Sequence, residues 1–205
     1  MLQIPTSMKL LLALSVTLIL VFVIIQLYAR KSQQDIETYP YTVIKTFKGF
    51  EIRQYESRLF TSVKLSSNDY SKVSGQGFSI LSGYIFGCNA TNEKIAMTSP
   101  VAMTLDDSMT MMFMVPKGKE NNLPKPNDNQ IQFKEEPAKI VAAISFGGWA
   151  NQDKIAQYKK QLVEGLQAQN IAHTNQFYFL GYNAPYEVFN RKNEVIVELQ
   201  KADLD

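Results

Sequence analysis

Cysteine, histidine and tryptophan are scarce in this 205-residue chain, which has one of each. Because Cys88 stands alone, no disulfide can form within the chain, and cysteine usage does not place the protein in an oxidising compartment. Because His173 is the only imidazole, neither a histidine-rich metal cluster nor a Ser/His/Asp or Cys/His nucleophilic set can be assembled. The sequence therefore offers no catalytic residue and no metal-ligand set that we can assign.

An excess of charge of one sign is also absent. Setting aside Lys9, Arg30 and Lys31 near the N-terminus leaves 18 of the 21 Lys and Arg residues against 19 Asp and Glu. Both signs are interspersed, so we expect no nucleic-acid partner. The chain has no low-complexity tract and is long enough for one domain with a sizeable core.

One long hydrophobic run is present, from Leu10 to Ala29. It holds about twenty residues without a charge and, at ~1.5 Å rise per residue, can cross ~30 Å of hydrocarbon as a helix. The hydrophobic region of a signal peptide is usually ~7–15 residues long and ends at small residues, whereas this run is longer and ends beside Arg30 and Lys31. The alternatives are a cleaved signal peptide and a buried core helix. We expect an uncleaved, single-pass transmembrane anchor.

The charges that flank the run do not fix its orientation. Lys9 and the terminal amine on one side face Arg30 and Lys31 on the other, so the positive-inside comparison is nearly a tie. The short N-terminal tail is typical of a signal anchor that leaves the following domain on the extracytoplasmic side, which is the side we favour. We divide the chain into a membrane anchor at 1–31, a polar spacer at 32–40 and a soluble domain at 41–205.

Turn signals and apolar periodicity divide the domain into strands and two helices. Ser67 or Asn68 can cap the first helix, which should end at Gly87, and Asn151 can cap the second. Each glycine inside the first helix lowers helix stability by up to ~1 kcal/mol relative to alanine. We therefore expect these glycines to be needed where the helix closely approaches a sheet or a ligand. The predicted strands are 41–47, 50–55, 59–65, 94–103, 109–115, 131–136, 140–146, 177–182 and 194–199.

An internal repeat organises these elements. The aligned segments are 58–65 with 139–146, 80–84 with 162–166, 95–101 with 180–186, and the strand at Met111 with that at Val195. Each copy, about 50–116 and about 131–200, reads as strand, helix, strand, strand. Both helices should then cover one face of a shared antiparallel sheet, an α+β architecture in which a cleft can form on the pseudo-symmetry axis. The duplication also predicts that Gly83 and Gly165 occupy equivalent positions against the sheet.

Several separated motifs match one known family in the same order. They are Phe50-Glu51-Ile52-Arg53-Gln54-Tyr55, Tyr84-Ile85-Phe86-Gly87-Cys88-Asn89, Lys94-Ile95-Ala96-Met97-Thr98-Ser99-Pro100-Val101, Pro124-Lys125-Pro126, Phe146-Gly147-Gly148, Gly181-Tyr182-Asn183-Ala184-Pro185 and Arg191-Lys192-Asn193-Glu194-Val195. Together they resemble the SOUL haem-binding protein family over nearly the whole domain. The resemblance implies a duplicated βαββ fold, an antiparallel sheet or distorted barrel with two helices like that of effector-binding domains, and haem or another tetrapyrrole as ligand.

The chain departs from the family at Gln54. In some members the matching position is a histidine proposed as axial haem ligand, and glutamine cannot supply an imidazole. His173 is predicted to lie in a polar turn after the second helix, where a lone histidine is more often solvated than a ligand. We therefore expect haem to be held mainly by apolar contacts, with no axial ligand assigned, and Gln54→His to raise haem affinity.

The candidate residues for contact with haem come from both halves of the domain. The guanidinium group of Arg191 could form hydrogen bonds to a haem propionate. In the alternative interpretation, Arg191 lies in a solvated hairpin turn and contacts no ligand. Aromatic rings offer flat surfaces for a planar ligand but also serve as core. In the interpretation that we favour, the methionines fill the core. In the two alternatives, they form a soft apolar wall for the ligand or they bind copper(I). The predicted set is Phe78, Leu81, Tyr84, Met97, Met103, Tyr182 and Arg191.

The function that the sequence favours is a membrane-tethered, non-enzymatic binding protein for haem or another planar amphipathic molecule. Two alternatives remain. One is an enzyme of the related effector-domain kind, which would modify a small hydrophobic ligand with a buried glutamate. The other is a scaffold that binds a protein and no small molecule.

Overall fold

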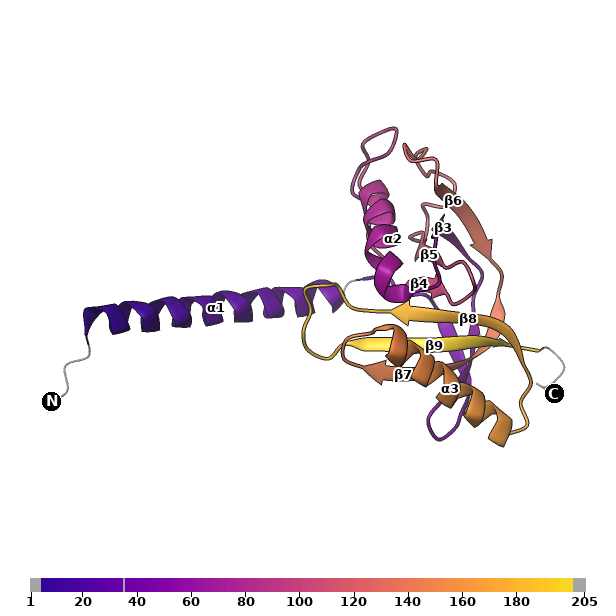
Figure 1. The fold of residues 1–205 in the computed structure, drawn as a ribbon. Helices are drawn as coiled ribbons and strands as arrows, with labels where there is room; N and C mark the ends of the chain where they lie inside the picture. The colour runs from indigo at the N-terminus through magenta and orange to yellow at the C-terminus, as the bar shows by residue number, and fades with distance from the viewer. Residues whose placement is uncertain (1–4, 35, 201–205) are drawn as a thin grey trace.

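The fold is given by a computed structural model that describes residues 5–34 and 36–200, without the side chains of residues 29–34 (Figure 1). The statements above about Arg30, Lys31 and the two chain ends therefore lie outside the described residues. The elements are α1 (Thr6–Gln34), β1 (Tyr41–Thr46), β2 (Glu51–Tyr55), β3 (Arg58–Lys64), α2 (Tyr70–Ile85), β4 (Val101–Thr104), β5 (Thr110–Met114), β6 (Ile131–Glu136), β7 (Lys139–Gly147), α3 (Gln152–Ala168), β8 (His173–Gly181) and β9 (Lys192–Leu199).

The strands form one antiparallel sheet with the order β1-β2-β7-β9-β8-β4-β5-β3-β6. From β2 to β6, the order is unchanged when it is reversed and each strand is replaced by its counterpart in the other repeat. The counterparts are β2 and β6, β3 and β7, β4 and β8, and β5 and β9. A pseudo-twofold axis therefore passes between β4 and β8. The predicted duplicated α+β fold is confirmed, and each repeat also includes the predicted strand that precedes its four elements, β2 or β6.

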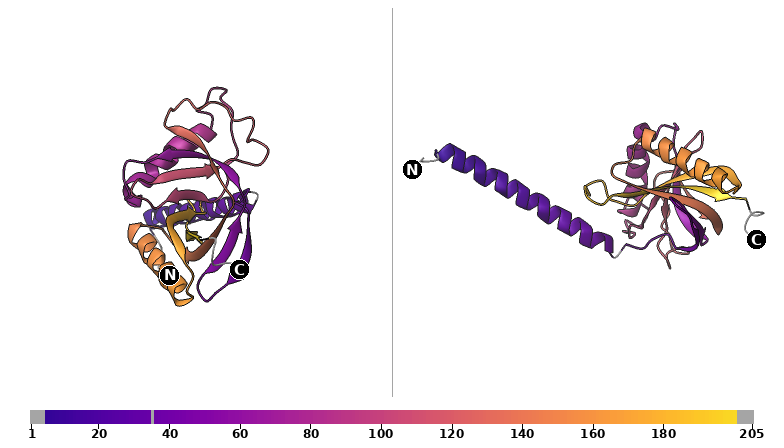
Figure 2. Two further views of the ribbon diagram at one scale, coloured as in Figure 1. Left: turned by 90° about the vertical axis from the view of Figure 1, so that its right-hand side faces the viewer. Right: turned by 90° about the horizontal axis from the view of Figure 1, so that it is seen from below.

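The sheet curls into a half-barrel (Figure 2). Only Glu56 and Ser57 join β2 to β3, although these strands are second and eighth in the sheet. The two ends of the sheet must therefore approach each other. Tyr39 lies at this junction, with its ring centroid 4.5 Å from that of Tyr55 on β2 and 5.2 Å from that of Phe60 on β3.

Both helices cover the outer face of the curl, as the duplication predicts. Leu81 of α2 and Leu162 and Leu166 of α3 are fully buried in one hydrophobic cluster with the outer face of the sheet. Each such side chain contributes ~1.5–3 kcal/mol through burial. A second cluster fills the inside of the curl and includes Tyr55, Phe60, Met112, Val141 and Ile196.

The helix ends follow local capping chemistry. Asn151 accepts a hydrogen bond from the Lys154 amide at 2.9 Å and caps α3, as predicted. The predicted cap of α2 was wrong, because Asp69, rather than Ser67 or Asn68, accepts from the Ser71 amide at 3.1 Å. Gly87, with a φ of 114°, ends α2, as predicted for the first helix of the domain.

The strand alignment of the repeat holds residue by residue. Segments 58–65 and 139–146 have the same sequence of buried, half-buried and exposed positions over all eight residues. The helix alignment pairs two buried residues, Tyr84 and Leu166, whereas a shift by one residue pairs the fully buried Leu81 with Leu162. The proposed second copy of the Pro100 joint is wrong, since Pro100 precedes β4 whereas Pro185 follows β8. At both places a proline interrupts the hydrogen bonding between strands, and the similarity between the two segments extends no further.

The predicted equivalence of Gly83 and Gly165 is wrong, because the two glycines have different surroundings. A Cβ atom on Gly165 would lie 3.2 Å from the Phe50 ring, whereas one on Gly83 would meet only Cys88, at 3.9 Å. Gly77 is the glycine of α2 that approaches the sheet, with Leu65 Cδ2 3.1 Å from the position of a Cβ atom. Gly83 therefore has room for a side chain that Gly165 lacks.

Two further predictions are corrected. The strand expected at 94–103 begins only at Val101, because Ser99 instead pairs with the segment before β1: its amide donates to Glu37 O, and its carbonyl accepts from the Tyr39 amide, both at 2.9 Å. His173 is the first residue of β8 rather than part of a polar turn, with its ring centroid 5.5 Å from that of Phe177.

The N-terminal helix α1 extends from the domain (Figure 1). Within it, Thr6–Tyr28 is long and apolar enough to cross a membrane by length and composition, a test that a signal sequence also passes. Among residues 5–28, all side chains are exposed except that of Gln26, which is half-buried. The domain therefore leaves the apolar surface of α1 uncovered.

Candidate ligand-binding cleft

A cleft of about 250 Å³ lies over β4 and β8, on the pseudo-twofold axis. The first half of α2 forms one wall, and the residues before α3 together with the β8–β9 loop form the other. The duplication predicted a cleft at this position. Residues that define its floor and walls include Tyr70, Gly75, Phe78, Val101, Met103, Met111, Trp149, Phe179, Pro185 and Arg191.

The floor of the cleft is apolar and well packed. Met103 and Phe179 are buried in the outer hydrophobic cluster, and the Tyr70 ring meets Phe179 edge-on with centroids 5.0 Å apart. Phe78 packs against Phe113 with centroids 5.5 Å apart. Such a floor offers a flat or bulky ligand aromatic surface and an adaptable methionine.

The two glycines in the first half of α2 have different surroundings. A Cβ atom on Gly75 would have nothing within 4 Å, and this residue lines the cleft. Gly77 instead faces the sheet, where Leu65 and Met111 leave little space. Within one turn of the same helix, Gly75 thus faces the cleft and Gly77 faces the sheet.

Arg191 is the only charged side chain among the described residues that line the cleft. Its guanidinium lies over the Trp149 ring, 3.9 Å from the centroid, and Nη1 donates to the carbonyls of Ala184 and Glu187. Its Nε is buried without a hydrogen-bond partner. Burial lowers the pKa of Arg191, and the charge of Glu187 opposes that shift. The result is a positioned cation in the cleft wall.

The structure brings three of the seven predicted contact residues to this cleft: Phe78, Met103 and Arg191. The other four lie elsewhere. Leu81 is fully buried beneath α2, and Met97 packs against the edge of the same cluster. Tyr84 donates to Pro124 O at 2.8 Å, and burial raises its pKa to about 12. Tyr182 belongs to the network described below.

Sequence reasoning did not assign Tyr70, Gly75 or Pro185 to the site. Gly75 is one of the helix glycines for which close approach to a sheet or a ligand was expected, but the sequence did not show which of them faces a cleft. Tyr70 and Pro185 gave no such signal, because a tyrosine on a helix face and a proline in a loop are common.

Gln54 and His173 do not line the cleft. Gln54 is exposed on β2, paired between Thr42 and Ile140. A histidine at position 54 would therefore lie outside this cleft. Within the described residues, no group of three or more His, Cys, Asp and Glu side chains could hold a metal ion. The soft donors that line the cleft are the thioethers of Met103 and Met111.

A buried ionic network lies on the inner face of the curl, centred on the fully buried Glu194. Arg53 donates to its two oxygens at 2.9 and 3.0 Å, and Tyr182 and Ser145 donate at 2.6 and 2.8 Å. Burial alone would raise the pKa of Glu194, but the hydrogen bonds and charge of Arg53 hold it below its ordinary value. Glu194 is thus an ionised structural group with its acceptor sites occupied.

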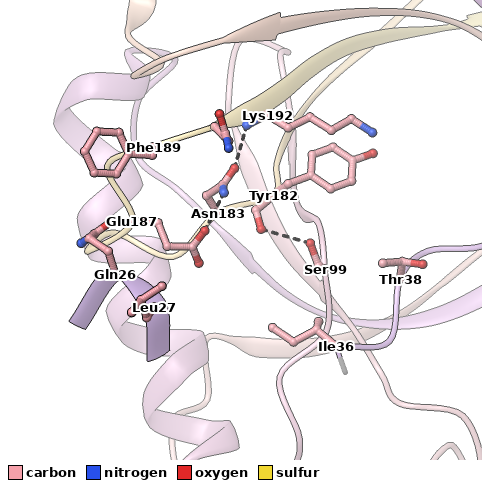
Figure 3. Close-up of a pocket in the computed structure, with 11 residues that line it drawn as sticks. Gln26, Leu27, Ile36, Thr38, Ser99, Tyr182, Asn183, Glu187, Phe189 and Lys192 are labelled. Atoms are coloured by element: carbon pink, nitrogen blue, oxygen red, sulfur yellow. Dashed lines mark hydrogen bonds between the residues drawn. The ribbon is translucent and has the colours of Figure 1, made fainter. Parts of the chain in front are cut away.

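A second hollow, of about 600 Å³, lies between the end of α1 and the β8–β9 loop (Figure 3). Gln26 and Leu27 of α1 face Phe189 and Glu187 of the loop. Asn183 ties the loop together, since it accepts from the Lys192 amide at 2.7 Å and donates to Glu187 at 2.6 Å. Because Asn183 lines both hollows, this loop forms a wall shared by the cleft and the α1 contact.

Comparison with known proteins gives one family and one fold. The family model of SOUL heme-binding protein matches residues 36–198. The chain is 27% identical over 155 residues to Heme-binding protein 1 of Xenopus laevis, covering 72% of this chain and 82% of the relative. It is 25% identical over 174 residues to Heme-binding protein 2 of Mus musculus, covering 80% and 82%. The solved C-terminal domain of EcmrR is similar with a TM-score of 0.59 at 13% identity, covering 78% of this chain and 98% of that one, which shows the fold alone.

Proposed function

The chain belongs to the SOUL heme-binding protein family, and from this premise we propose that it is a membrane-tethered binding protein for haem or a related tetrapyrrole. The ligand occupies the cleft between α2 and the β8–β9 loop. The observation that carries the proposal is the lining of this cleft: an apolar and aromatic surface with Arg191 as its single charge. A tetrapyrrole with carboxylate side chains has the matching chemistry, a broad apolar ring with anionic groups on one edge.

Apolar contacts supply most of the affinity. Each ~100 Å² of apolar surface removed from water contributes ~2.5 kcal/mol, from which association costs of ~4 kcal/mol or more must be subtracted. Arg191 adds a charge-assisted hydrogen bond to a ligand carboxylate, in the range of ~1.5–3 kcal/mol. Haem would bring iron, for which the thioethers of Met103 and Met111 and the phenol of Tyr70 are lining groups with a donor atom. Burial raises the pKa of Tyr70, which disfavours the phenolate form that would bind iron. Because thioethers are weak ligands, a metal-free porphyrin should bind within about tenfold of haem, which corresponds to ~1.4 kcal/mol.

Titration of haem and metal-free protoporphyrin against the full chain in detergent tests this proposal. Arg191→Gln should weaken binding of both by about 10-fold to 140-fold, the equivalent of one charged hydrogen bond. Arg58→Gln, which removes a half-buried arginine from β3 outside the cleft, is the matched control and should change little. A porphyrin whose carboxylates are esterified should bind wild type and Arg191→Gln equally. Equal loss in both arginine variants would contradict a specific role for Arg191.

We propose that α1 is the tether. The support is its length and the exposure of its apolar side chains, which the domain does not cover. The protein should remain with membranes after extraction at alkaline pH. Recovery of a shortened, soluble chain beginning near Arg30 would identify the segment as a cleaved signal instead. Protease protection in sealed vesicles tests on which side of the membrane the domain lies.

We further propose that the cleft binds its ligand without turnover. None of the described residues that line the cleft is acidic, and the buried Glu194 is held by Arg53 on the opposite face of the sheet. A hydrolytic mechanism based on a buried glutamate would need such a group at the cleft. Ligand recovered chemically unchanged after prolonged incubation with the protein supports binding, and ligand conversion that Glu194→Gln abolishes would favour the enzyme.

A further inference from the structure

The β8–β9 loop carries exposed apolar side chains at its tip. Tyr186, Val188 and Phe189 are 53%, 43% and 62% exposed. These residues lie between the strand ends Gly181 and Lys192, so their backbone is held at both sides by the sheet. A cluster of exposed apolar side chains on one loop is typical of an interaction surface rather than of a solvated turn.

This tip lies against the membrane-span candidate. The Phe189 ring meets Phe22 of α1 edge-on, with centroids 6.3 Å apart. Gln26 donates from Nε2 to Tyr186 O at 3.1 Å and accepts from the Val188 amide at 3.2 Å. Gln26 is the only polar residue in the last two turns of the apolar span that contacts the domain, and both its hydrogen-bonding groups are used by the loop backbone.

The depth of these contacts can be worked out from the helix. Thr6–Tyr28 contains 23 residues, and at ~1.5 Å per residue it is ~34 Å long, slightly more than a ~30 Å hydrocarbon core. Phe22 lies ~9 Å before Tyr28 along the axis, and so roughly 7 Å inside the hydrocarbon edge of a centred span. Gln26 lies ~3 Å before Tyr28 and so at the edge of the hydrocarbon, where it supplies hydrogen-bond partners to the loop backbone.

We propose that the apolar side chains of Tyr186, Val188 and Phe189 enter the bilayer beside α1 and form a second membrane contact. The carboxylate of Glu187 stays buried inside the loop, where it accepts from Asn183 and from the Ala184 amide. The proposal rests on the tether proposed above. Since Asn183, Pro185 and Arg191 of the same loop line the cleft, this contact places the cleft wall at the lipid surface. An amphipathic tetrapyrrole dissolved in the bilayer then reaches the cleft without crossing water, with Arg191 at the level of the polar headgroups.

A fluorescence experiment on the full chain in phosphatidylcholine liposomes tests the contact. An environment-sensitive fluorophore is attached to Phe189→Cys in a Cys88→Ser background, and the control protein carries the same label on its native Cys88. Cys88 follows the end of α2 that points away from the cleft, and α2 is a 16-residue helix ~24 Å long. Lipids with a nitroxide at a shallow acyl position should reduce the emission at position 189 to less than about half, because interfacial segments reach ~5–10 Å into the bilayer. Emission at position 88 should not change.

Flotation of the same liposomes separates the two proposals. If the protein floats with the lipid and the label at 189 remains as accessible to water as the label at 88, the loop contact is overturned while the tether stands. If the protein does not float, the tether fails and the loop contact fails with it.

A second measurement tests the route to the cleft. Phe189→Asp should slow haem transfer from preloaded vesicles by about tenfold, the factor expected from losing one buried phenylalanine contact. Phe86→Asp changes a similarly exposed residue, at 60%, beyond the end of α2 and serves as control. Equal transfer rates in the two variants would overturn loading from the bilayer.

Discussion

Replacing Gly75 tests the cleft assignment because stability and ligand binding should change in opposite directions. Gly75 lies inside α2, lines the cleft, and would have no atom within 4 Å of an added Cβ. Glycine costs up to ~1 kcal/mol relative to good helix formers, so Gly75→Leu should stabilise the fold by up to that amount. For a chain of this size the melting temperature should rise by about 2–4 °C.

The same leucine side chain occupies part of a cleft of only about 250 Å³. Forcing a ligand past an added side chain costs ~1–3 kcal/mol, which corresponds to about 5-fold to 140-fold weaker binding. Gly75→Ala is the matched control, since it should give a similar gain in stability with little obstruction. Gly77→Leu should instead destabilise the fold by ~1–3 kcal/mol, because Leu65 and Met111 leave no room.

The assay combines thermal denaturation with absorbance titration of haem on the full chain in detergent. A folded, stabilised Gly75→Leu protein that binds haem as tightly as wild type would refute the placement of the ligand in this cleft. A Gly75→Leu protein that is less stable than wild type would contradict the claim that Gly75 has room for a side chain.

The remaining predictions concern the buried network and the sequence-based ligand hypothesis. Glu194→Gln should destabilise the domain by ~3–5 kcal/mol in urea denaturation, because it leaves Arg53 buried without its partner charge; a loss below ~1 kcal/mol would show that the pair is dispensable. Since the folded-state pKa of Glu194 lies below its ordinary value of 4.5, its stabilising contribution is present above about pH 4.5 and lost as pH falls through the lower folded value. Wild-type stability should therefore fall in acid, with a shallower slope in Glu194→Gln, and parallel slopes would contradict the assignment. Gln54→His should leave haem affinity within about twofold of wild type, less than ~0.5 kcal/mol, because position 54 does not line the cleft; a marked gain would point to a site at β2.

The sequence predicted the parts of the fold that depend on periodicity. The strands at 58–65 and 139–146 carry the same burial pattern, so their alignment located the repeat correctly. The sequence allows two helix alignments that differ by one residue, because Ile80 and Leu81 are both apolar and only packing decides which of them faces the sheet. The pairing of Ser99 with Glu37 and Tyr39 involves backbone groups, which leave no pattern in side-chain polarity.

The site was predictable only in part. Arg191 was found because its charge and position suit a carboxylate, and Phe78 and Met103 were included as apolar partners from the first repeat. Tyr84 and Tyr182 looked equally suitable by type, but one is buried with its hydroxyl on Pro124 and the other donates to Glu194. Which aromatic residues face a cleft and which face a core depends on the direction of each side chain after folding, and that direction is set by contacts distant in sequence.

The most direct test of the central claim uses the methionines of the full chain, which has eight. Met103 and Met111 line the cleft, whereas Met112 and Met114 pack inside the curl on the opposite face of the sheet. With ¹³C-methyl methionine labelling, and resonances assigned by single Met→Leu replacements, titration with metal-free protoporphyrin should shift the Met103 and Met111 methyl signals through the ring current. The Met112 and Met114 signals should stay in place. Shifts confined to Met112 and Met114, or porphyrin binding that moves none of these signals, would contradict the account.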